Sequence, residues 1–137
     1  MKIVICGSMT ASKEMIDVEK KLKEMGHEVI LPDFVHDYAL MDTTEEMHKE
    51  SVQNKVKHDL IRDYFKKIKD SDAIIVVNIE RKGIKGYVGG NSFLEIGFAF
   101  VLDKRIYFLH EIPDVGYRDE IEAMSPIVLS GDLSKII

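Results

Sequence analysis

Short apolar runs alternate with amphipathic stretches along the whole chain. The runs, typical of buried strands, lie at residues 3–6, 27–31, 73–77, 105–109 and 126–129. Between them, apolar residues recur at helical spacing, as in Met15, Val18, Leu22 and Met25, and again in Ile61, Tyr64, Phe65 and Ile68. The latter stripe is interpreted as part of the core. The run at 73–77 is continuous and rich in β-branched residues, which is typical of a central parallel strand.

This alternation of strands and helices predicts an α/β three-layer sandwich. We expect a five-stranded, mainly parallel sheet in flavodoxin-like (Rossmann-like) order, because each strand–helix–strand unit makes a right-handed crossover. The chain has 137 residues, 45% of them hydrophobic, which suffices for one compact domain spanning residues 1–137.

Charge and cysteine content narrow the function classes. The net charge is −5, and lysines are interspersed with acidic residues, so we expect neither a nucleic-acid polymer nor a membrane as partner. The single cysteine, Cys6, lies in an apolar run and is predicted to be a buried thiol. No stretch resembles a signal peptide or a membrane span, and a lone cysteine forms no internal disulfide, so the predicted location is cytoplasmic.

Residues 86–100 combine a glycine-rich loop with an apolar helix that carries one carboxylate, Glu95. A buried carboxylate is costly unless another group pairs with it or the protein uses it. Two explanations are open at this point. Glu95 either closes a capping box with Ser92, or it faces a pocket and serves a function.

In a sheet of this order, the loops after the strands meet at one edge, where such folds bind ligands. Candidate substrate-binding residues in these loops are Gly7, Ser8, Asp33, Asn78, Gly89, Gly90, Asn91 and Ser92. Gly7 and Ser8 precede a helix N-terminus, a place that favours an anion such as a phosphate. The acidic loop at 32–42 lacks a diagnostic ligand spacing, so we expect no metal. The first loop lacks the run of Ser and Thr hydroxyls that a flavin phosphate favours, so we expect no cofactor. Thr43 and Glu46 are predicted to cap a long helical region.

Three segments together resemble the nucleoside 2-deoxyribosyltransferase family, whose superfamily includes the 2′-deoxynucleoside 5′-phosphate N-hydrolases. They are the strand at 72–77 with its glycine-bearing loop, residues 94–99, and the strand at 105–109. The sharpest motif is Glu-x-Gly-x-Ala, formed by Glu95, Gly97 and Ala99. The resemblance implies that Glu95 attacks the anomeric carbon of the sugar and holds a covalent glycosyl intermediate, which water or a second base then resolves. The departing base also needs a proton, and the candidate acids are Asp33, Asp37, Asp63 and Asp72, of which Asp72 is less favoured because it lies at the start of a strand. The resemblance implies an acid from around the helix before the third strand, and Asp63 is the nearest match.

The chain departs from the family pattern in three respects. Transferases receive an asparagine from the C-terminal region of a neighbouring subunit, whereas no asparagine follows Asn91 here. Transferases have an aspartate six residues before the nucleophile and the hydrolases tend to have a serine, whereas this chain has Gly89. The hydrolases also have a basic residue near the first loop, where this chain has Met9 and Thr10. The hypothesis is therefore cleavage or transfer at the N-glycosidic bond of a nucleoside or its monophosphate. The alternative is a non-catalytic nucleotide-binding or signalling domain on the same fold.

The apolar residues of the helix that carries Glu95 indicate that the protein associates with itself. Its large apolar residues point in more directions than one sheet can cover; they are Phe93, Phe98, Phe100 and Leu102. Because an exposed apolar patch is unusual on a monomer, we expect a homo-oligomer packed near this helix.

Overall fold

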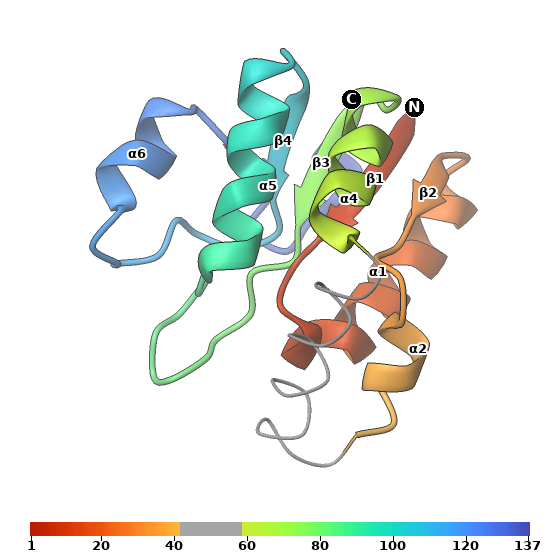
Figure 1. Cartoon of the computed structure of the whole chain (residues 1–137), viewed down its shortest axis with the longest axis horizontal. Coiled ribbons are helices and arrows are strands. Elements are labelled where there is room, and N and C mark those ends of the chain that lie inside the picture. The colour runs from red at the N-terminus through yellow and green to blue at the C-terminus, as the bar shows by residue number, and fades with distance from the viewer. Residues whose placement is uncertain (42–58) are drawn as a thin grey trace.

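The computed structural model describes residues 1–41 and 59–137, and these residues contain a five-stranded sheet (Figure 1). Its strands are β1 (Lys2–Cys6), β2 (Glu28–Ile30), β3 (Ala73–Val76), β4 (Arg105–Phe108) and β5 (Ile127–Val128). The order is β2-β1-β3-β4-β5, and every neighbouring pair is parallel. This confirms the predicted flavodoxin-like α/β fold.

Helices follow the strands in chain order. They are α1 (Ser12–Glu24), α2 (Val35–Tyr38), α4 (Leu60–Lys69), α5 (Gly90–Val101) and α6 (Arg118–Ala123), with 3-10 turns η1 (Met9–Ala11) and η2 (Leu133–Lys135). Within the described ranges, no helix is both long and apolar enough to cross a membrane. The predicted cap at Thr43 and Glu46 lies outside the described residues.

Side-chain alternation in the strands divides the core into two layers. Ile3 and Ile5 pack with α1 on one face of the sheet, while Val4 and Cys6 pack with α4, α5 and α6 on the other. This arrangement follows from the two-residue period of a strand, which sends successive side chains to opposite faces. Cys6 is fully buried, as the sequence predicts.

The α4 stripe predicted as core is only partly buried. Tyr64 and Ile68 are buried between α4 and the sheet, but the side chain of Ile61 is 41% exposed. The prediction was wrong for Ile61 because it lies in the first turn of α4, which extends past the sheet to the rim of a pocket.

The start of α5 decides between the two explanations of Glu95. The helix begins at Gly90 with Gly89 as its N-cap residue, and Gly89 makes no side-chain cap. Ser92 therefore lies inside the first turn and is not the N-cap, so the capping-box explanation was wrong. Ser92 is buried, and one turn further on Glu95 is buried as well.

Candidate functional site

A pocket lies at the carboxyl edge of the sheet, beyond the ends of β1 and β2. Four segments form it: the turn after β1, the loop after β2, the start of α4 and the first turns of α5. The described residues that line it are Met9, Pro32, Asp33, Tyr38, Leu60, Ile61, Asp63, Tyr64, Asn91, Leu94, Glu95 and Phe98. Apolar side chains dominate its lining, as is common in small-molecule sites.

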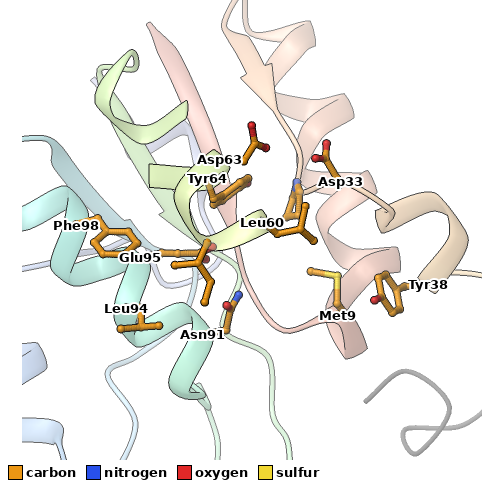
Figure 2. Close-up of a pocket in the computed structure, with 12 residues that line it drawn as sticks. Met9, Asp33, Tyr38, Leu60, Asp63, Tyr64, Asn91, Leu94, Glu95 and Phe98 are labelled. Carbon is orange, nitrogen blue, oxygen red and sulfur yellow. The ribbon is translucent and has the colours of Figure 1, made fainter. Parts of the chain in front are cut away.

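Glu95 lies in the α5 wall of this pocket (Figure 2). Glu95 is 7% exposed, and Ile96 and Ala99 on the same helix are fully buried against the sheet. The helix therefore holds this carboxylate at the boundary between the core and the pocket. Asn91, one turn before Glu95 on the same helix, lines the pocket too.

Cys6 and Tyr64 are neighbours of Glu95 that interact with its charge. Burial first, and then the charge of Glu95 and a hydrogen bond with it, raise the pKa of the Cys6 thiol well above its ordinary value. The thiol thus keeps its proton and can donate it to the carboxylate. The Tyr64 hydroxyl donates to the backbone carbonyl of Ile5. Burial, followed by nearby negative charges, raises the pKa of Tyr64 well above its ordinary value.

Two further carboxylates lie across the pocket from Glu95 (Figure 2). Lys67 Nζ is 3.1 Å from Asp33 Oδ1 and 3.0 Å from Asp63 Oδ2, so one lysine on α4 bridges the loop after β2 to its own helix. Burial lowers the pKa of Lys67, but hydrogen bonds to Asp63 and Asp33 and their charges outweigh it and raise this pKa overall. The Asp33 and Asp63 side chains are 47% and 44% exposed.

A basic residue that the sequence did not predict lies near the first loop. Arg81 Nη1 donates to Ser8 Oγ at 3.2 Å, and Ser8 Oγ lies 2.9 Å from Thr10 Oγ1. Arg81 pairs with Ile84 across a tight turn and lies over the ring of Tyr87. The loop after β3 therefore brings a guanidinium to the turn after β1.

Asn78 has a different environment from the one its position after a strand suggested. Its Oδ1 accepts the His110 amide at 2.9 Å, and its Nδ2 donates to the carbonyls of His110, Glu111 and Gly86 at 3.0, 3.0 and 3.3 Å. This side chain thus ties the loop after β3 to the loop after β4. Gly86 has a φ of 67°, and a Cβ there would lie 2.2 Å from the Glu111 carbonyl oxygen, so this position requires glycine.

The structure brings part of the predicted site together. Of the residues predicted from the sequence, Glu95, Asp63, Asp33 and Asn91 line the pocket. The others, Gly7, Ser8, Asn78, Gly89, Gly90 and Ser92, are not among its described lining residues. Gly7 and Ser8 directly precede the pocket residue Met9, and Gly90 directly precedes Asn91. The fold thus defines an α/β protein of flavodoxin-like order with a carboxylate-bearing pocket at the usual edge.

Comparison with solved structures shows that the fold is known from other proteins. The solved structure of Clostridium botulinum CMP N-glycosidase, BcmB, has a TM-score of 0.51 and 18% sequence identity. The alignment covers 93% of this chain and 88% of that one, so the shared fold extends over nearly the whole of both. Neither the models of known protein families nor the curated protein sequences match the chain.

Proposed function

We propose that this protein cleaves or transfers at the N-glycosidic bond of a (deoxy)nucleoside or nucleoside monophosphate, with Glu95 as the nucleophile. The observation that carries the proposal is the buried Glu95 carboxylate in the wall of the pocket. A protein of similar fold is named as a CMP N-glycosidase, which makes this reaction class the natural one to test. Fold alone does not fix function, so the argument depends on the pocket.

The chemistry suits a carboxylate in this position. As the N-glycosidic bond breaks, its electron pair goes to the base and positive charge builds on the sugar ring. A Glu95 oxygen bonds to C1′ to give a glycosyl ester, and the base gains one proton. Water then attacks C1′ and releases Glu95 as a carboxylate while its spare proton goes to solvent. A second base in place of water gives a new nucleoside.

We propose that Asp63 delivers the proton that the departing base needs. It lies in the same pocket as Glu95, and solvent reaches its side chain, which is 44% exposed. Asp63 is ionised beside Lys67 when the base binds; as the base leaves, it passes a proton from solvent to the base and is a carboxylate again afterwards.

Ser8, Thr10 and Arg81 are the residues we propose for the 5′-phosphate. Two hydroxyls and a guanidinium lie together beside Met9 of the pocket. A guanidinium and hydroxyl donors are suited to phosphate oxygens. Arg81 thus supplies, from the loop after β3, the positive charge that the first loop lacks.

Gly89 and Gly90 are proposed to leave room for the sugar. A Cβ at Gly90 would meet no atom of the described residues within 4 Å, and Gly89 has a φ of −85°. Neither packing nor backbone conformation requires glycine at these two positions. A close approach of substrate to the N-terminus of α5 would account for both, with Asn91 and Ser92 as polar neighbours.

We also propose a homo-oligomer that uses the outer face of α5. Phe93 packs on Tyr117 and Phe98 on Phe65, whereas Phe100 and Val101 are 47% and 72% exposed. Light scattering at micromolar concentration should show a species larger than the monomer, and Val101→Glu should shift it towards monomer. A wild-type monomer would contradict the proposal.

The test of the reaction is release of free base, measured by chromatography. Deoxynucleosides, nucleosides and their 5′-monophosphates are incubated with the wild type, with Glu95→Gln and with Glu120→Gln, an exposed glutamate of α6 that serves as control. We expect Glu95→Gln to lose at least about 1,000-fold in kcat/KM and Glu120→Gln to keep wild-type activity. Equal release by wild type and Glu95→Gln would exclude the mechanism. Binding without release by either would favour a nucleotide-binding module. Adding a second free base separates transfer from hydrolysis.

A further inference from the structure

The acidic side of the pocket is an organised group. Asp33 comes from the loop after β2 and Asp63 from α4, and both reach Lys67 Nζ within 3.1 Å. Two carboxylates placed this close repel each other, and the lysine between them offsets that repulsion. Lys67 Nζ also lies 5.6 Å from the centre of the Tyr64 ring, which limits its freedom on that side. Lys67 thus fixes both carboxylates in the pocket wall.

The two side chains of this group that line the pocket are hydrogen-bond acceptors, whereas the lysine that holds them is a donor. Asp33 and Asp63 line the pocket, while Lys67 is not among the described lining residues. An ionised carboxylate accepts hydrogen bonds and donates none. The wall therefore presents acceptors, and a bound molecule must offer donors to it.

The remaining lining suits a flat ring. Leu60, Leu94 and Phe98 line the same pocket, and they supply an apolar surface for the faces of a nucleobase. A base held against these side chains would direct its polar edge to the pocket's polar groups. On the side of the carboxylate pair, that edge meets two acceptors.

Nucleobases differ at this edge. Cytosine and adenine carry an exocyclic amino group with two N–H donors, whereas uracil and hypoxanthine carry a carbonyl oxygen at the same ring position. One amino group can donate one hydrogen to each carboxylate. A carbonyl oxygen at the same place would face two acceptors, and leaving such groups unpaired in a binding site is costly.

We propose that Asp33 and Asp63, held by Lys67, select nucleotides whose base carries an exocyclic amino group over those with a carbonyl oxygen at that position. This inference rests on the proposed function for its site and extends it to the class of base. Asp33 is the residue that tests it, because Asp63 also has a proposed part in proton handling.

The experiment compares two matched pairs: cytidine with uridine 5′-monophosphate, and adenosine with inosine 5′-monophosphate, each in ribo and deoxy form. We expect kcat/KM to favour the amino member by about 10-fold or more in the ring size that the pocket accepts. In Asp33→Asn the amide can also donate, so the ratio should fall towards one. Asp17→Asn, which breaks an exposed ion pair with Lys21 on α1, is the matched control and should keep the wild-type ratio.

Calorimetric titration of the same nucleotides into Glu95→Gln reads the preference without turnover. Tighter binding of the amino members that depends on Asp33 supports the inference even if the wild type releases no base, in which case the proposed function alone fails. Base release with no preference, or with a ratio unchanged in Asp33→Asn, overturns the inference and leaves the proposed function standing. No binding and no release overturns both.

Discussion

The carboxylates on the two sides of the pocket have opposite environments. Glu95 is 7% exposed, lies in an apolar helix and contacts the protonated thiol of Cys6. Asp33 and Asp63 are nearly half exposed and share a lysine. The same chemical group can serve two tasks when its surroundings differ, as is common for paired acids in active sites. In the proposed reaction, the buried Glu95 bonds to the sugar, and the solvated Asp33 and Asp63 bind the base and handle its proton.

The largest effect on kcat/KM should come from variants of Glu95 and Asp63 that change the length of the side chain but keep its charge. We expect Glu95→Asp to lower kcat/KM by at least about 100-fold, since a nucleophile withdrawn by one methylene misses its target atom. Asp63→Glu should cost less than about 10-fold because its exposed side chain can adjust. Base-release kinetics of the two variants measure the difference. Equal losses would show that the two sides do not differ in the way proposed.

Thiol labelling tests the buried side independently of activity. Because burial and Glu95 raise the pKa of Cys6, native protein at pH 8 should react with iodoacetamide at least about 100-fold more slowly than urea-unfolded protein. Mass spectrometry follows the labelling, and the chain has one cysteine, so the readout is unambiguous. Rapid labelling of the native protein would contradict the description of the Glu95 environment.

A pair of glycines on α5 tests whether substrate passes close to the start of this helix. Gly90→Ala should keep the wild-type melting temperature but lower kcat/KM by about 10-fold through contact with substrate. Gly97→Ala, also in open space on the same helix, should keep activity and stabilise the fold by about 0.5–1 kcal/mol. Full activity in Gly90→Ala would show that the sugar does not lie close to the start of α5.

The smallest effect is expected on the solvated side. Lys67→Met should lower the free energy of unfolding by less than about 1 kcal/mol at pH 7, because its two ion pairs are partly exposed. Since the folded state raises the pKa of Lys67, this contribution is complete below its ordinary value near 10.5 and is lost as the pH rises through the folded-state pKa. Urea unfolding should therefore show a constant difference from pH 6 to 9 that disappears in strong alkali. A difference that vanishes near neutral pH would contradict this assignment.

Local patterns were enough to predict the fold. The five strands and their order followed from apolar runs alternating with helical spacing, and the apolar character of α5 pointed to Glu95 as a carboxylate that needs an explanation. The choice between cap and pocket needed the structure, because α5 begins at Gly90 and not after Ser92.

Long-range contacts between loops were not predictable from such patterns. Arg81 and Ser8 are 73 positions apart, and Lys67 and Asp33 are 34 apart. No periodicity connects them, since a tight turn and a helix bring these side chains together in three dimensions. Likewise, a position after β3 could not reveal that the amide of Asn78 is engaged by the loop after β4.

The most direct test of the account is to trap the glycosyl intermediate. A 2-fluoro-2-deoxyribosyl nucleotide slows the second step more than the first, so the ester should accumulate and be detectable by mass spectrometry of peptides. The account predicts one sugar adduct per chain, located on Glu95 and absent in Glu95→Gln. Base release without an adduct, or an adduct on another residue, would contradict the assignment of Glu95 as the nucleophile.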